Sequence, residues 1–200
     1  MPDPATKAVI RPATSEDTEA ILRVVYAAYR GVGDEAGWTT ESHLLGGERT
    51  NRAEVEAAMT TPGTRLLVAA LAPSFDGDEG QGGRVVGVIR VTRRGDDGAA
   101  FGLFAVDPSL QSGGIGSALL EAAETVARDD WGRSWIAMEV IHQRTDLQAW
   151  YRRRGYVATG EARPFPYEDQ RFGLPRRDDL VFDVLRRPLR GVDAPTADGP

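Results

Sequence analysis

The chain has 200 residues, of which 41% are hydrophobic and 27% are charged, the composition of an ordinary globular protein. At this length we expect one domain that buries about 70% of the surface exposed by the unfolded chain. Asp and Glu outnumber Lys and Arg by 30 to 24, and the net charge of −6 lacks the basic excess needed to bind a nucleic-acid backbone. We therefore expect no nucleic-acid partner.

Cysteine and histidine usage narrows the chemistry further. The absence of cysteine rules out disulfides, thiolate metal sites and a cysteine nucleophile. The two histidines, His43 and His142, are too far apart in sequence to predict a histidine-rich metal cluster, so no metal is expected. Residues 1–12 lack the apolar segment of a signal peptide, and no apolar run approaches the roughly 18 residues of a membrane span. The prediction is a cytoplasmic protein with no membrane partner, and a homodimer is left open.

The first quarter of the chain predicts a strand, a helix, a long loop and a second helix. Residues 7–14 read as a short strand, and Thr14 with Asp17 has the spacing of a capping box, so a helix should begin there. Gly31 ends it. Residues 34–50 show no clear period and are expected to form a loop with at most one helical turn, followed by a short helix over 51–60. The apolar stripe of the first helix is Ile21, Val24, Val25, Ala28 and Tyr29.

Three consecutive strands are predicted in the middle of the chain, over 64–70, 84–93 and 99–106. A long connection at 72–83 and a Gly-Asp turn at 94–98 join them. Strands linked in this way form an antiparallel meander.

From Gly114 the apolar period becomes helical and continues to just before Trp131. The remaining pattern predicts a buried strand, a helix and two further strands. They cover 134–141, 146–154, a strand that begins at 156–160, and 178–187.

A Gly-rich turn joins the strand ending at Val106 to the helix that begins at Gly114. Backbone N–H groups at a helix start are unpaired and the helix dipole favours negative charge, while Gly114 and Gly116 let a pyrophosphate approach the main chain. A P-loop would need Gly-Lys-[Ser/Thr], and the dinucleotide fingerprint needs a third Gly where Leu119 stands. The turn therefore predicts a phosphate-bearing ligand, with a merely tight strand-to-helix connection as the alternative.

Two motifs resemble one family. Gln111-x-x-Gly114-x-Gly116, after a strand that ends in Val106-x-Pro108, is similar to the acetyl-CoA signature of the GCN5-related N-acetyltransferases (GNAT). Residues 149–156 resemble that family's late A-x-Y-x-x-x-G-[FY] stretch. The resemblance covers about residues 7–189. It implies the α/β GNAT (acyl-CoA N-acyltransferase) fold, a mixed, mostly antiparallel sheet flanked by helices on both faces. We expect a single domain over 1–189 and a disordered tail at 190–200.

The resemblance also implies transfer of an acetyl group from acetyl-CoA, as co-substrate, to a primary amine of a small molecule or peptide. The family often has basic residues at the positions of Gln111 to Gly113, and this chain has none there. Arg144 stands where many members carry an Asn that touches the cofactor. Backbone groups of Phe104, Ala105 and Val106 would meet the pantetheine arm, and main-chain amides of Gln111, Ser112, Gly113, Gly114, Ile115, Gly116 and Ser117 would cradle the pyrophosphate.

Acetyl transfer needs a base for the amine and an acid for the leaving thiolate. Strand alternation puts Glu139 on the face shared by Trp135, Ala137 and Ile141, where we expect it to be partly desolvated. Some family members use an acid at the matching position as general base. A Glu that reaches solvent or pairs with an Arg is the alternative.

Tyr151 matches the family's tyrosine proton donor to the CoA sulfur. Its alternative is packing, because Leu147, Trp150 and Tyr151 form one helical stripe.

Residues Trp38, Glu41 and Tyr167 are the expected contacts with the acceptor, since aromatic and acidic groups suit an amine. Neither histidine is assigned a role. A non-catalytic acyl-CoA-binding module with the same fold is the alternative function.

Overall fold

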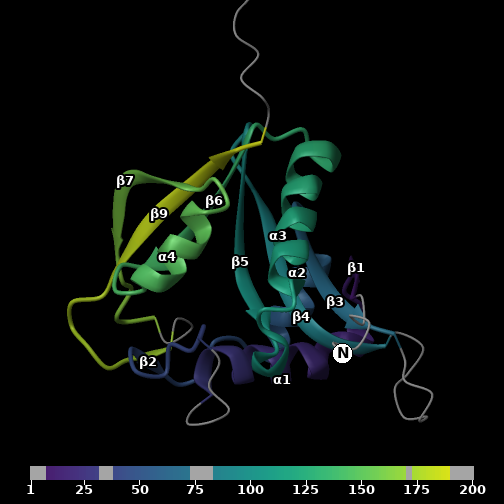
Figure 1. Cartoon of the computed structure of the whole chain (residues 1–200), viewed down its shortest axis with the longest axis horizontal. Helices are drawn as coiled ribbons and strands as arrows, with labels where there is room; N and C mark the ends of the chain where they lie inside the picture. The colour runs from purple at the N-terminus through teal and green to yellow at the C-terminus, as the bar shows by residue number, and fades with distance from the viewer. Residues whose placement is uncertain (1–7, 32–37, 73–82, 170–172, 190–200) are drawn as a thin grey trace, which may run out of the picture.

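The structure, a computed structural model, describes residues 8–31, 38–72, 83–169 and 173–189. One sheet dominates this part of the chain, and helices cover both of its faces (Figure 1). Its strands are β1 (Val9–Pro12), β3 (Thr64–Leu71), β4 (Arg84–Arg94), β5 (Gly98–Val106), β6 (Trp135–Ile141), β7 (Val157–Pro164) and β9 (Val181–Pro188). The helices are α1 (Thr18–Arg30), α2 (Arg52–Thr60), α3 (Ile115–Thr125) and α4 (Thr145–Arg152).

The strand order is β1-β3-β4-β5-β6-β9-β7. Each neighbouring pair runs antiparallel except β5 and β6, which are parallel. The predicted mixed, mostly antiparallel sheet and the β3-β4-β5 meander are confirmed.

Local sequence signals explain how α1 begins. The Thr14 amide donates to Asp17 Oδ2 at 2.8 Å, and the Asp17 amide donates to the Thr14 carbonyl at 3.0 Å. This reciprocal pair is the predicted capping box, and it closes a short 3₁₀ turn at Ser15–Asp17 before the α-helix proper.

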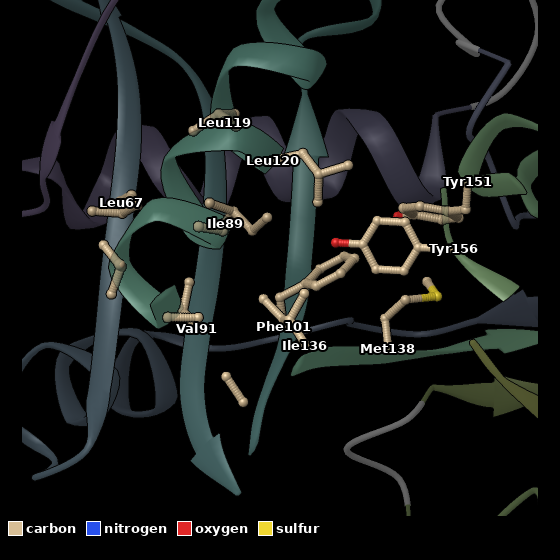
Figure 2. Packing of buried hydrophobic residues seen from close by; sticks show 14 of the residues in the cluster. Leu67, Ile89, Val91, Phe101, Leu119, Leu120, Ile136, Met138, Tyr151 and Tyr156 are labelled. Atoms are coloured by element: carbon tan, nitrogen blue, oxygen red, sulfur yellow. The ribbon is translucent and has the colours of Figure 1, made fainter. Parts of the chain in front are cut away.

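Two apolar cores lie on opposite faces of the sheet. On one face, α3 packs on β3, β4 and β5, and aromatic rings continue the cluster towards α4 (Figure 2). On the other face, α1 and α2 pack on the same strands. The first core includes Leu67, Ile89, Val91, Phe101, Leu119, Leu120, Ile136, Met138, Tyr151 and Tyr156; the second includes Ile21, Val24, Val25, Val55, Leu66, Val68, Val88 and Leu103.

The two parallel strands are paired over only a short length. Gly98–Ala100 of β5 align with Trp135–Ala137 of β6, and beyond them the strands diverge (Figure 1). The pairing of β5 with β4 is also irregular, because the register shifts between Val88 and Arg90 and Leu103 has φ of 45°. This bulge costs on the order of 1–3 kcal/mol, a strain that often marks functional sites. The sheet therefore opens between β5 and β6.

A few elements differ from the sequence prediction. The expected loop at 34–50 contains β2 (Leu45–Gly46), which pairs with β8 (Leu174–Pro175). A two-residue strand is too short to produce a period, so it could not be predicted from the residue pattern. Past Thr125, α3 continues as a π-helical turn over Val126–Asp130, which agrees with the predicted end before Trp131.

Parts of three predicted segments, the connection at 72–83, the loop at 34–50 and the tail at 190–200, lie outside the described residues. In the part of the chain that is described, no helix is long and apolar enough to cross a membrane.

Candidate active site

A cavity of about 920 Å³ passes through the opening between β5 and β6. Residues from both faces of the sheet line it. Met138 and Val140 of β6 belong to the core under α3, so Glu139 between them faces the α1 side. The Gly-rich turn, residues 38–41 of the loop after α1 and Glu139 all contribute to its lining.

The Gly-rich turn presents free amides to the cavity. Gly114 caps α3 with φ of +84°, a conformation that favours glycine, and the first helical bond runs from the Ala118 amide to the Gly114 carbonyl at 3.0 Å. Within the described residues, the amides of Ile115, Gly116 and Ser117 have no acceptor. A Cβ on Gly116 would lie 3.7 Å from both Phe104 and Val106, so this glycine forms part of the wall. The turn has the geometry of an anion site.

The end of β5 supplies a second row of backbone groups. Ala105 faces Val88 of β4, so alternation directs the carbonyls of Phe104 and Val106 to the open edge. There, Phe104 O accepts from the Tyr29 hydroxyl at 3.0 Å and Val106 O from Gln111 Nε2 at 3.3 Å. Tyr29 was expected only as part of the apolar stripe of α1, but its hydroxyl also fixes this strand.

The predicted cofactor residues divide into two groups. Ala105 and Ile115 are packed in the cores on opposite faces, and their side chains, like Gly113, do not line the cavity. Those that line it are Phe104, Val106, Gln111, Ser112, Gly114, Gly116 and Ser117.

Arg154 supplies the positive charge that residues 111–113 lack. Its guanidinium stacks 3.5 Å from the centre of the Trp150 ring, and its Nη2 donates to Ser117 Oγ at 2.7 Å. Arg154 therefore stands beside the free amides and lines the cavity. The stacking of Arg154 on Trp150 could have been predicted from the sequence, since Arg154 follows Trp150 by one helical turn.

Tyr151 is 3% exposed and lines the same cavity. Its ring centre lies 5.0 Å from Trp150, 5.8 Å from Phe101 and 5.7 Å from Tyr156, and Figure 2 shows it beside Tyr156 at the edge of the core. Its hydroxyl has no hydrogen-bond partner in the described part of the chain. Burial raises the pKa of Tyr151 well above its ordinary value, so the phenol keeps its proton at neutral pH. Packing and proton donation are thus compatible at this position.

The prediction that the Glu139 side chain is partly desolvated was wrong. Its side chain is 34% exposed rather than desolvated, and its Oε1 accepts from Arg163 Nη1 at 2.6 Å. The reason is that β7, which carries Arg163, lies beyond β9 and its arginine reaches over to this face. Glu139 does line the cavity, but as a member of an ion pair.

Glu41 is the more deeply buried carboxylate of the cavity, with 8% exposure. Burial raises its pKa, although the charges of Arg49, Arg144 and Arg30 oppose the shift. Its oxygens lie 3.9 Å from Arg30 Nη1 and 3.8 Å from Arg144 Nη1, distances that leave the carboxylate without a hydrogen bond in the described residues. Glu41 can therefore still accept a proton or a donor.

Arg144 holds the loop that carries Glu41. It is 3% exposed, and its guanidinium donates to the carbonyls of Trp38 and Thr39 at 3.2 and 3.0 Å and to Asp146. A phosphate contact for Arg144 is therefore not supported. Its role is to position residues 38–41.

Gln111 ties this loop to the Gly-rich turn. Its Nε2 donates to Thr39 Oγ1 at 2.8 Å, and its Oε1 accepts from the Trp38 amide at 3.1 Å. Trp38 lines the cavity, and its ring lies 6.4 Å from that of Trp150. The loop and the Gly-rich turn are thus direct neighbours, joined by two hydrogen bonds.

The remaining candidates lie outside the cavity. Tyr167 packs on Phe165, and its hydroxyl accepts from the Leu180 amide at 2.7 Å. His142 pairs with Asp183 at 2.8 Å with an exposed ring, and His43 is exposed. The described residues contain no group of three His, Asp or Glu placed to hold a metal ion.

Comparison with known proteins gives one family match. Residues 63–158, which include the strands around the opening, α3 and α4, match the model of the acetyltransferase (GNAT) domain. A search of curated proteins finds no match.

Solved structures share the fold over nearly the whole chain. Ard1 from Thermoplasma volcanium is 21% identical over 92% of this chain and 99% of its own, with a TM-score of 0.64. The structure of yncA from Salmonella typhimurium, solved with its cofactor acetyl-CoA, is 19% identical over 95% of this chain and 98% of its own, with a TM-score of 0.63. A spermidine N-acetyltransferase SpeG chimera from Vibrio cholerae and hSSAT is 13% identical over 92% of this chain and 96% of its own, with a TM-score of 0.63. These likenesses confirm the predicted fold.

Proposed function

We propose that the chain, whose residues 63–158 match the model of the acetyltransferase (GNAT) domain, transfers the acetyl group of acetyl-CoA to a primary amine of a small molecule or peptide. The observation that carries this proposal is the cavity that crosses the sheet between β5 and β6. Free helix amides and the carboxylates of Glu41 and Glu139 all border it. A donor bound on one face and an acceptor bound on the other would meet at the opening.

The residues present suit acetyl-CoA. The amides of Ile115, Gly116 and Ser117, together with Arg154, would hold the pyrophosphate. The open edge of β5 at Phe104 and Val106 would receive the pantetheine arm. Gly116 is needed here because a larger side chain would fill the space between Phe104, Val106 and Trp150.

When bound, acetyl-CoA supplies an acetyl thioester, and transfer joins the acetyl carbon to the amine nitrogen as the carbon–sulfur bond breaks. The chain has to take one proton from the amine and give one to the sulfur. Tyr151 is the proposed donor, because its buried phenol is protonated and borders the cavity. Glu139 is the proposed acceptor of the amine proton, directly or through water, and its ion pair with Arg163 holds the carboxylate towards the cavity.

A thiol-release assay tests the function. The protein contains no cysteine, so free thiol formed from acetyl-CoA in the presence of an amine comes only from CoA. We expect thiol release that depends on the amine, with an acetylated product in the mass spectrum.

The matched control is Gly116→Glu, which places bulk and negative charge in the turn and should abolish both acetyl-CoA binding and thiol release. Binding of acetyl-CoA with no product from a broad panel of amines and peptides would instead favour the non-catalytic module. An unchanged dissociation constant in a folded Gly116→Glu protein would refute the assigned pyrophosphate site. The cytoplasmic location stays a prediction from the sequence.

A further inference from the structure

Two arginines, Arg49 and Arg90, line the cavity near Glu41 and form no ion pair at contact distance in the described part of the chain. Arg90 of β4 stands opposite Leu66 of β3, which packs under α1, so Arg90 shares that face of the sheet. The guanidinium of Arg49 lies 5.2 Å from the centre of the Tyr29 ring. Among the described residues, neither guanidinium forms an ion pair or a hydrogen bond.

Arg49 and Arg90 therefore make the electrostatic potential in this part of the cavity positive. Burial and the charge of Arg49 lower the pKa of Arg90, and the charge of Glu54 opposes this shift, so the two cations repel each other. The neighbouring Arg30 and Arg144 are buried and both lie near Glu41, and Arg144 also pairs with Asp146. Like charges in a half-buried site repel, and an anionic ligand would relieve the repulsion.

Glu41 supplies the complementary charge in the same part of the cavity. Its carboxylate lines the cavity and its hydrogen-bonding capacity is free within the described residues. A molecule that fits a carboxylate beside two unpartnered guanidiniums carries a cation and an anion close together.

We propose that the acceptor is a small amine that also carries a carboxylate, of the amino-acid type. Arg49 and Arg90 bind the carboxylate, and Glu41 receives the amine. Planar guanidiniums match carboxylates in geometry and charge. This inference rests on the proposed function only in naming the bound molecule as the acceptor. A polyamine such as spermidine would place further cations against the arginines, so likeness to a spermidine acetyltransferase in fold does not extend to the acceptor.

Matched pairs of probes test the proposal in two ways. The first is thiol release with each common L-amino acid and its uncharged α-amide, which differ in the carboxylate alone. We expect kcat/KM for the preferred acid to exceed that for its amide at least about tenfold. Arg49→Gln and Arg90→Gln should raise KM for the acid by about tenfold to a hundredfold and leave the amide nearly unchanged, because charged hydrogen bonds are lost.

The second test needs no turnover. Calorimetry with the N-acetyl derivatives of the same amino acids, in the presence of CoA, should show binding that either arginine substitution removes. Arg23→Gln, an exposed arginine on α1 that does not line the cavity, is the matched control and should change neither measurement. Acetyl-CoA affinity should also be the same in all variants.

The outcomes separate the two proposals. Arginine-dependent binding of carboxylates with no acetylation of any amine would refute the acetyltransferase function and keep the carboxylate site. Acetylation that is equal for acids and amides, or fastest for polyamines, would keep the function and overturn the inference. Loss of acetyl-CoA affinity in Arg49→Gln or Arg90→Gln would also overturn it, since the arginines would then belong to the cofactor.

Discussion

Replacing Tyr151 with Phe separates proton donation from packing, because it deletes the hydroxyl and keeps the ring. The aromatic contacts with Phe101, Trp150 and Tyr156 remain. No hydrogen bond is lost among the described residues, so the free energy of unfolding should stay within about 0.5 kcal/mol of wild type. Loss of a general acid should lower the turnover rate about a hundredfold or more, which corresponds to about 2.7 kcal/mol in activation free energy.

For Tyr156→Phe, in the same aromatic cluster, we expect the opposite: a loss of stability with unchanged turnover. The Tyr156 hydroxyl donates to Glu124 Oε1 at 2.8 Å in a buried position, and Tyr156 does not line the cavity. Losing a hydrogen bond to a carboxylate costs about 1.5–3 kcal/mol. For a chain of this length that lowers the melting temperature by about 3–12 °C, while turnover at a temperature where the protein is folded should be unchanged.

Single-turnover kinetics, acetyl-CoA affinity and a melting curve on both variants complete the comparison. We expect slow transfer with normal melting for Tyr151→Phe, and normal transfer with reduced melting temperature for Tyr156→Phe. Turnover of Tyr151→Phe within a few-fold of wild type would refute the proton-donor assignment and leave Tyr151 as a packing residue.

Three further predictions address the charged residues. Arg154→Gln should weaken acetyl-CoA binding about tenfold or more and reduce its dependence on salt, whereas Arg153→Gln, an exposed neighbour outside the cavity, should not; equal affinities by calorimetry would remove Arg154 from the cofactor site. Glu139→Gln should lower kcat with acetyl-CoA affinity unchanged, and a kcat within a few-fold of wild type would move the base to Glu41. Burial raises the folded-state pKa of Glu41 above its unfolded value, so its contribution to stability is present below pH 4.5 and is lost as pH rises through the folded pKa. Denaturant unfolding from pH 4 upwards should therefore show the free energy of unfolding of wild type falling relative to Glu41→Gln, and a constant difference between the two proteins would contradict the shift.

The features of the fold that the sequence predicted well are local ones. The capping box at Thr14, the apolar stripe of α1 and the Gly-rich turn each lie within a few consecutive residues, and their chemistry depends on backbone conformation. Periodicity also predicted that Glu139 shares a face with Trp135 and Ala137, and the structure places that face on the α1 side.

What periodicity could not supply was the neighbour of each side chain. Glu139 is exposed and ion-paired because Arg163, 24 residues later, returns on β7. Tyr167 falls outside the cavity because its hydroxyl binds the Leu180 amide. Both outcomes depend on how the last strands and loops pack, which no local pattern encodes.

Local sequence patterns also could not predict the charged residues proposed to bind the acceptor, because these residues come from segments that are distant in sequence. Glu41 and Arg49 belong to a loop without period, and Arg90 to a strand that otherwise reads as apolar. An arginine within the run Val88-Ile89-Arg90-Val91 is the one visible anomaly, since a cation on a core-facing row needs a reason. The pairing of Arg90 with Leu66 and Gly102 puts it on the α1 face, and the opening of β5 from β6 gives it access to the cavity. In the proposed function, selection of the acceptor would therefore depend on strand register and sheet opening, whereas binding of the donor would depend mainly on a contiguous turn, with the edge of β5 and Arg154 beside it.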